Sequence, residues 1–313
     1  MPLISVIIPN YNGEKWLSKT IDSCLQQKEY LHEIIVIDDH STDGSWNVLS
    51  YYQSEYPDII KIARNKSKGG NQARNYGFEL SGGEFIQWLD VDDQLLPGKF
   101  AAQLDSFGKC ADADIVYSDW RLDIYAGSGE IRSTEYKVQQ QHEDFLLQLL
   151  IDNWSPPHNY LLRKGFAEKL QKIKAWNPET PVFQDREYFT LAAIGGGKFQ
   201  YVPGLFCVYN RWSSQSVSQN KGKRNDTLLG LFSEFARYIE DSNEIGSVKK
   251  KQYRKIIITN KLLTLLTMGN LLVRDKDMKA SNIYWAVIKD YRTKAKILFA
   301  LILNKFSPAK NGS

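Results

Sequence analysis

The chain has 313 residues, of which 42% are apolar, and its formal net charge is only +4. A chain of this length and composition can bury a sizeable core, in one large domain or in one domain with an appendage. Its basic residues are scattered until the C-terminal third, whereas a nucleic-acid-binding protein usually concentrates them on one face, so we expect no nucleic-acid partner. Three widely spaced cysteines lack zinc-binding spacing and suit buried free thiols in a reducing compartment.

No segment has the pattern of a signal peptide or of a membrane span. The first apolar run is short and ends at Pro9, and the longest apolar run, 297–303, is far below the roughly 18 residues that cross a bilayer. These patterns predict a cytoplasmic location.

The first part of the chain alternates between apolar runs typical of buried strands and patterns typical of helices. Strands are predicted at 3–9, 33–38, 59–63 and 84–89, with helices around 17–25, up to about 56, and over 69–80. Alternating strands and helices predict an α/β fold whose parallel sheet is covered on both faces. Ligands of such sheets bind beyond the carboxyl ends of the strands. Polar clusters stand at three of these ends, at 11–12, 38–39 and 90–93.

The pattern changes after about residue 115. Strands are predicted at 115–118, 120–125, 160–162, 199–202 and 205–209, and helices at 145–151 and 185–194. Long apolar-periodic segments from Thr227 onward predict a helical appendage.

The segment Trp88-Leu89-Asp90-Val91-Asp92-Asp93 carries the strongest chemical signal. Three carboxylates within four residues repel one another, and a divalent cation such as Mg²⁺ or Mn²⁺ would relieve the repulsion while bridging them to a diphosphate. The alternative is a solvated loop in which Asp93 caps the next helix.

Two further segments suit a nucleotide. Tyr11 offers an aromatic face for a nucleobase, and Asp39 offers a carboxylate for its imino proton; the alternative for Asp39 is a turn or a helix cap. The glycines that precede the helix at 69–80, together with Arg74, suit an anion, although an ordinary loop-to-helix junction would look the same.

Four motifs in this order resemble family 2 glycosyltransferases of the GT-A fold. They are the segments 4–12 (ISVIIPNYN), 33–44 (EIIVIDDHSTDG), Gly69-Gly70 with Ala73-Arg74-Asn75, and 89–93 with Pro97. The resemblance is strong over about 3–105, fair over 150–217 and absent beyond. It implies that Tyr11 and Asp39 hold the base, that Arg74 lies near the donor, and that the three aspartates touch ribose, metal and diphosphate. The full donor-binding set that we expect is Pro9, Tyr11, Asp39, Asn65, Arg74, Asp90 and Asp92, with Asp92 and Asp93 as metal ligands.

The resemblance also nominates Asp185 as the catalytic base. Asp185 opens a predicted helix within Phe183 to Phe189 and is followed by the Tyr209-Asn210-Arg211-Trp212 segment, as in the family. The alternative is that Asp185 only caps its helix, which is worth about 1 kcal/mol. The chain departs from many members by Gln184 before the base, and by Ser213 or Ser214 where they carry a histidine, so we expect the metal to depend on the aspartates and phosphates alone.

These observations predict an inverting, metal-dependent transfer of a sugar from a nucleotide sugar, with Mn²⁺ or Mg²⁺ as cofactor. Tyr11 and Asp39 together suit a uridine nucleotide. The acceptor would be a hydroxyl of a glycan or lipid-linked saccharide of the bacterial cell envelope, approaching Trp154, His158 and Arg211, although Trp154 could equally be a core residue. We expect a catalytic domain at 1–220, with a donor half at 1–110 and an acceptor half at 111–220, and a helical region at 221–313.

An apolar stripe with lysines beside it runs from Tyr284 onward. Its members are Tyr284, Val287, Ile288, Tyr291, Ala295, Leu298 and Ile302. Such a helix can lie in a membrane interface, which would place the protein peripherally on the cytoplasmic face of the inner membrane. The alternative is that the stripe packs on the catalytic domain or on a second copy of the chain, as in a homodimer.

Three other functions share parts of this pattern. A metal-dependent phosphatase with an Asp-x-Asp strand end would need a downstream lysine and acidic pair that the chain does not show. A nucleotidyltransferase would normally have a glycine-rich loop after the first strand, unlike Asn10-Tyr11-Asn12-Gly13. A non-catalytic nucleotide-sugar-binding protein would tolerate the loss of Asp185.

Overall fold

The structure, a computed structural model, describes residues 3–151, 154–212 and 221–268, together with 283, 284, 293, 294 and 297. The chain divides into two compact units. The first contains Met1–Glu143, Ser155–Thr180 and Gly196–Ser216, and the second contains Asp144–Trp154, Pro181–Gly195 and Val217–Ser313. This division differs from the expected boundary at residue 220, because two inner segments group with the C-terminal helices.

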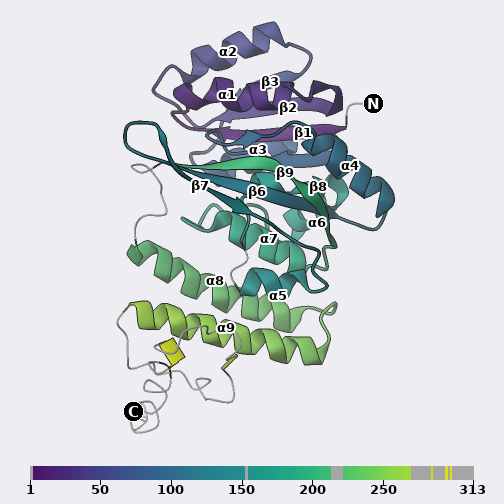
Figure 1. The fold of residues 1–313 in the computed structure, drawn as a ribbon, viewed down its shortest axis with the longest axis vertical. Coiled ribbons are helices and arrows are strands. Elements are labelled where there is room, and N and C mark those ends of the chain that lie inside the picture. The colour runs from purple at the N-terminus through teal and green to yellow at the C-terminus, as the bar shows by residue number, and fades with distance from the viewer. Residues whose placement is uncertain are drawn as a thin grey trace. The chain divides into compact units, whose positions relative to one another are not determined.

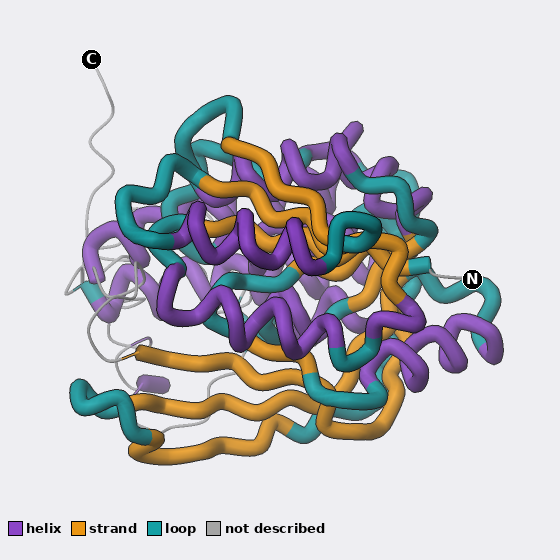
Figure 2. The backbone as a smooth tube through the Cα atoms, turned by 90° about the horizontal axis from the view of Figure 1, so that it is seen from above, coloured by secondary structure: helices purple, strands orange, loops and turns teal. Residues whose placement is uncertain are grey.

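A nine-stranded sheet forms the centre of the first unit (Figure 2). Its strands are β1 (Ile4–Asn10), β2 (Leu31–Asp38), β3 (Ile60–Arg64), β4 (Phe85–Trp88), β5 (Gln94–Leu95), β6 (Ile115–Tyr125), β7 (Ile131–Lys137), β8 (Leu161–Arg163) and β9 (Phe199–Trp212). Their order is β3-β2-β1-β4-β8-β6-β9-β5, with β7 paired to β6. The first four strands of this order are parallel, and the rest of the sheet is mixed. The predicted α/β fold is confirmed.

Helices of the first unit flank this sheet (Figure 1). They are α1 (Glu14–Leu25), α2 (Ser45–Glu55), α3 (Gly70–Leu80), α4 (Lys99–Lys109) and α6 (Lys164–Lys174), with short 3₁₀ turns at Lys28–Tyr30 and Pro157–Asn159. The apolar residues of β1 and β2 are buried because helices cover this parallel region. Gly77 lets α3 approach the sheet closely, since a Cβ there would lie 2.5 Å from Cγ2 of Ile7.

The second unit is helical among its described residues. It contains α5 (Phe145–Leu150), α7 (Gln184–Ile194), α8 (Lys221–Asp241) and α9 (Ser247–Thr267) (Figure 1). Their apolar faces form one buried cluster, in which Leu150 and Leu191 pack with Phe235 and Ile256. Burial of this shared apolar surface explains why α5 and α7 group with the C-terminal helices. Among the described residues, no helix is both long enough and apolar enough to cross a bilayer.

Several expectations about the elements need correction. Segments 115–118 and 120–125 form one strand, β6, because the polar pair at 118–119 is satisfied by neighbours: the Ser118 hydroxyl donates to Asn159 Oδ1 at 2.9 Å, and Asp119 accepts the Tyr201 hydroxyl at 2.9 Å. Likewise, β9 continues across 203–204, where Gly204 takes a φ of +136°. The exposed strand β7 and the helix α6 have no predicted counterpart.

Most of the stripe expected from Tyr284 onward lies outside the described residues, including Val287, Ile288, Tyr291, Ala295, Leu298 and Ile302. Two apolar residues from this region are described, and both are buried: Ile283 is 4% exposed and Ile297 is 0% exposed. They pack with Ile258 and Leu262 of α9, and the Tyr284 N–H donates to Thr259 Oγ1 at 2.8 Å. The described part of this region therefore packs within its own unit.

Candidate active site

The carboxyl ends of β1 and β2 carry the residues expected to bind a nucleobase. Pro9 lies within β1 and is half-buried, while the ring of Tyr11 is 52% exposed just beyond the strand. Asn10 is buried and donates from Nδ2 to Asp38 Oδ1 at 2.9 Å, because these two residues are register partners in the parallel pair. The exposed Tyr11 ring thus follows a rigid strand end and is accessible to a flat ligand.

The two aspartates after β2 have different environments. Asp38 is fully buried and accepts Arg64 Nη1 at 3.0 Å as well as Asn10, so its carboxylate holds the strand ends together. Asp39 accepts Asn65 Nδ2 at 2.8 Å and the Gly69 N–H at 2.8 Å, which fixes the loop before α3. A carboxylate has about four acceptor positions, so these donors leave capacity on Asp39 for a ligand N–H.

Arg74 connects α3 to the aspartate cluster. Its Nη2 donates to Asp90 Oδ1 at 2.5 Å and its Nη1 to Asn71 Oδ1 at 3.0 Å. The guanidinium also lies 4.7 Å from the ring centroid of Trp176, which is buried against Trp88. Arg74 therefore orients Asp90, and Trp176 is a core residue rather than a sugar platform.

Asp92 and Asp93 occupy opposite environments although they are adjacent. Asp93 is 0% exposed: its Oδ1 accepts the Asn210 N–H at 2.7 Å and its Oδ2 lies 3.2 Å from His158 Nδ1. Asp92 is half-buried, and burial together with the negative charge of Asp90 raises its pKa to about 7. Asp92, unlike Asp93, lines a hollow within the first unit.

His158 lies in the core rather than at an acceptor surface. It is 0% exposed, and burial lowers its pKa to about 3, while burial and the neighbouring aspartates raise the pKa of Asp93 well above its usual value. Both shifts favour the uncharged form of the group, which suits two side chains that are buried side by side. Their full burial speaks against an acceptor-side role for His158 and against a metal-ligand role for Asp93.

The loop that carries these carboxylates is held by two residues whose role in holding it the sequence patterns did not predict. Thr20 of α1 donates its hydroxyl to the carbonyl of Val91 at 2.6 Å and to that of Asp93 at 2.9 Å. Asn210 of β9 donates from Nδ2 to the carbonyl of Asp92 at 2.6 Å. Single polar residues inside a helix or strand give no signal of such a long-range role.

Asp90 and Asp92 suit a cation that is shared with a substrate. Among the described residues, no three His, Cys, Asp or Glu side chains gather as a complete metal site. Mg²⁺ and Mn²⁺ accept one or two carboxylates when substrate phosphates supply further oxygen ligands. Burial and the negative charge of Asp90 raise the pKa of Asp92, and a bound cation would relieve the repulsion between these two carboxylates.

The second unit holds Asp185 and Trp154. Asp185 lies in the first turn of α7, and its Oδ1 accepts the N–H of Arg186 at 2.9 Å. The indole Nε1 of Trp154 donates to Asp185 Oδ2. Phe183 precedes this helix with a φ of +61°. Of the other acceptor-side candidates, Arg211 is exposed on β9 in the first unit, and Ser213 and Ser214 lie outside the described residues.

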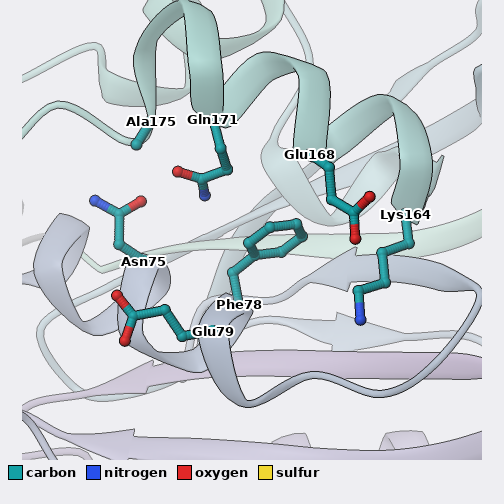
Figure 3. Close-up of a pocket in the computed structure, with 7 residues that line it drawn as sticks. All are labelled: Asn75, Phe78, Glu79, Lys164, Glu168, Gln171 and Ala175. Atoms are coloured by element: carbon teal, nitrogen blue, oxygen red, sulfur yellow. The ribbon is translucent and has the colours of Figure 1, made fainter.

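A hollow of about 500 Å³ between α3 and α6 is lined by different residues (Figure 3). Phe78 lies at its centre, between Glu79 on α3 and Glu168 and Lys164 on α6. The Lys164 ammonium donates to the carbonyl of Ser81 at 2.6 Å. The expected donor and metal residues line no part of this hollow, so it does not belong to the candidate site.

Comparisons with known proteins give a consistent result. A family model described as "Glycosyl transferase family 2" matches residues 5–169. The chain is 28% identical over 266 residues to a GalNAc(5)-diNAcBac-PP-undecaprenol beta-1,3-glucosyltransferase of Campylobacter jejuni, which covers 82% of this chain and 79% of that protein. The chain spans smaller shares, 38% and 21%, of two other curated relatives, which are uncharacterized glycosyltransferases.

Solved structures share the fold at low identity. The S. aureus TarS 1-349 structure in complex with UDP-GlcNAc matches with a TM-score of 0.62 and 15% identity, covering 96% of this chain and 79% of that one. The mannosyltransferase PcManGT from Pyrobaculum calidifontis, in complex with GDP-Man and Mn²⁺, matches with a TM-score of 0.55 and 17% identity, covering 97% and 87%. These likenesses support the expected GT-A arrangement of the sheet and its helices.

Proposed function

The chain belongs to glycosyl transferase family 2, and we propose that it moves one sugar from a UDP-sugar to a hydroxyl of a glycan or lipid-linked saccharide. The observation that carries this proposal is the edge of the parallel sheet, where Tyr11 is exposed, Arg74 orients Asp90, and Asp92 keeps a carboxylate for a ligand. UDP-GlcNAc in the TarS complex supports a UDP donor, and the Campylobacter relative supports a lipid-linked acceptor.

The donor would be bound by residues of β1, β2 and α3. The Tyr11 ring would stack on the uracil, and Asp39 would accept its imino N–H while still holding the 65–69 loop. Asp90, fixed by Arg74, would position the ribose and diphosphate. Because Asp39 and Asp90 are held before the ligand arrives, little ordering would accompany binding.

Asp90 and Asp92 would hold a Mn²⁺ or Mg²⁺ ion at the diphosphate. When bound, this ion would offset the negative charge that develops on the leaving group. Asp92, with a pKa of about 7 in its absence, would lose its proton on binding the cation. PcManGT with GDP-Man and Mn²⁺ supports metal use in this fold.

Asp185 would act as the general base for the acceptor hydroxyl. A hydroxyl is a poor nucleophile near neutral pH, and removal of its proton during attack typically contributes about 10²- to 10⁴-fold. The indole N–H of Trp154 would keep the Asp185 carboxylate oriented. One displacement of the diphosphate would invert the configuration at the anomeric carbon.

A lipid-linked acceptor would bring the enzyme to a membrane surface, on the cytoplasmic face of the inner membrane. Lys251, Arg254 and Lys255 are exposed on α9, and basic side chains near a membrane contribute about 1 kcal/mol each on anionic lipid. Flotation with anionic vesicles at low salt tests this contact. A Lys251→Glu/Lys255→Glu variant should float less than wild type, and wild type that stays unbound would remove the membrane contact from the proposal.

Release of UDP and analysis of the product test the main proposal. The purified chain with Mn²⁺ should release UDP from a UDP-sugar when a bacterial lipid-linked glycan is present, and NMR should show an inverted anomeric configuration. Asp185→Asn should slow UDP release by about 10²-fold or more, while Glu179→Gln, which changes an exposed carboxylate, should not. UDP release that is unchanged in Asp185→Asn would contradict the proposed base, and a retained configuration would contradict the single displacement.

A further inference from the structure

A hollow of about 360 Å³ lies beside Asp92 within the first unit. Its volume falls in the range of about 300–1,000 Å³ typical of small-molecule sites. Six separate segments contribute residues: α1, the loop after β4, β5, the end of β6, the turn that follows β6 and the end of β9. The lining residues that matter here are Lys15, Trp16, Asp92, Tyr125, Asn210 and Trp212.

Three aromatic rings form one wall of this hollow. Tyr125 and Trp212 are stacked, with centroids 3.9 Å apart and planes 18° from parallel. Trp16 lies 5.7 Å from Trp212. Both tryptophans are only half-buried, so part of this wall faces the hollow and is available to an apolar ligand face.

Charged and polar groups surround the aromatic wall. The Lys15 ammonium lies 4.0 Å from the Trp16 centroid and 5.5 Å from the Trp212 centroid. Three buried polar atoms of the lining, both indole Nε1 atoms and Asn210 Oδ1, have no hydrogen-bond partner among the described residues. Because buried polar groups are normally paired, these atoms mark a polar environment behind the aromatic wall.

We propose that this hollow binds the pyranose ring of a sugar, either that of the donor or the first sugar of the acceptor. A pyranose has an apolar C–H face that can lie on the aromatic wall and hydroxyls that can reach Lys15 and Asp92. A lipid tail would leave these polar groups unsatisfied, and the nucleobase has its own place at Tyr11. This assignment rests on the proposed function, because it places the ring next to the carboxylate that would face the diphosphate.

Calorimetry and saturation-transfer NMR with three kinds of probe test the proposal. The probes are UDP, the UDP-sugars UDP-GlcNAc and UDP-glucose, and the methyl β-glycosides of the same two sugars, all with Mn²⁺. The Trp212→Ala variant removes the centre of the wall, and Trp212→Phe restores an aromatic ring if the alanine variant fails to fold. Tyr51→Ala, which truncates a 60% exposed aromatic on α2, is the matched control.

If the ring is that of the donor, Trp212→Ala weakens UDP-sugar binding by about tenfold and leaves UDP binding nearly unchanged, since only the sugar contact is lost. If the ring is that of the acceptor, the methyl glycoside loses its saturation transfer while both UDP ligands keep their affinity. Trp212→Phe should recover most of the loss, and Tyr51→Ala should match wild type.

Equal losses for UDP and UDP-sugars would overturn the assignment, as would unchanged binding of every probe. Failure of the proposed function looks different: wild type then binds neither UDP nor UDP-sugars. In that case the methyl glycosides alone test whether the hollow binds a pyranose ring. Binding of a methyl glycoside to wild type that is lost in Trp212→Ala would support the assignment. Failure of the methyl glycosides to bind wild type would contradict it.

Discussion

Replacing Asp93 by asparagine separates a buried structural carboxyl from a metal ligand. In the structure, Asp93 Oδ1 accepts the Asn210 N–H at 2.7 Å, and Asp93 Oδ2 lies 3.2 Å from His158 Nδ1. An asparagine carbonyl can accept the same N–H, and its amide can donate to the imidazole. We therefore expect the free energy of unfolding to change by no more than about 1 kcal/mol.

The comparison with leucine gives the magnitude of the lost contacts. Asp93→Leu would leave the Asn210 N–H buried without this partner, at about 1–3 kcal/mol. The contribution of Asp93 to the stability of the folded protein also depends on pH, and the sign of this dependence follows from its pKa. Because the folded-state pKa of Asp93 is raised, its contribution to stability is fully present below the unfolded pKa of about 4 and is lost as pH rises toward the folded pKa. The asparagine variant should therefore gain stability relative to wild type as pH rises above about 4.

Urea unfolding at several pH values measures the stability part, and calorimetry of a UDP-sugar with Mn²⁺ measures the ligand part. Donor affinity should stay within about threefold in Asp93→Asn and fall by about tenfold or more in Asp92→Asn, because only the latter removes a charge-bearing metal ligand. A stable Asp93→Asn protein whose Mn²⁺-dependent affinity fell as far as that of Asp92→Asn would refute the buried role of Asp93.

Three more predictions concern the base, the metal and the arginine. Asp185→Asn should keep donor affinity in calorimetry but lower the transfer rate by about 10²-fold or more, whereas a rate within a few-fold of wild type would assign Asp185 to its helix end only. Because the pKa of Asp92 is about 7 without metal, raising the pH from about 6 to about 8 should strengthen Mn²⁺-dependent donor binding by up to about tenfold; a flat profile would speak against Asp92 as a ligand. Arg74→Ala should lower the free energy of unfolding by about 2 kcal/mol, less than for a fully buried pair because its partner Asp90 is 29% exposed. Lys198→Ala, from an exposed ion pair, should leave the free energy of unfolding nearly unchanged. Equal effects of the two substitutions in urea unfolding would contradict the role of Arg74.

The parallel half of the fold could be predicted because its strands are buried on both faces. The apolar runs that end near Pro9, Asp38 and Leu89 have no alternation, and the structure pairs them as β1, β2 and β4. The exposed strand β7 carries no comparable signal, since Ile131 and Tyr136 are largely exposed and its partner β6 alone fixes it. Edge strands of this kind are specified by pairing rather than by their own sequence.

The position of the candidate site could be predicted from the sequence, but the roles of its individual residues could not. Three adjacent carboxylates look alike in a sequence, whereas burial separates Asp93 from Asp92 in the structure. His158 follows two prolines in what resembles a surface loop, yet it is fully buried beside Asp93. Such differences in burial depend on which distant strand packs over each side chain. For Asp93 this strand is β9, whose Asn210 N–H donates to the Asp93 carboxyl.

The central claim is that a carboxylate-held cation and a nucleoside diphosphate bind together at the carboxyl edge of the parallel sheet. Calorimetric titration of UDP-GlcNAc with and without Mn²⁺, in wild type and in Asp92→Asn, tests it most directly. We predict that wild type binds UDP-GlcNAc with Mn²⁺ and at least about tenfold more weakly after EDTA treatment, and that Asp92→Asn has the weak affinity in both conditions. Equal affinity in wild type with and without Mn²⁺, or no binding under either condition, would contradict the account.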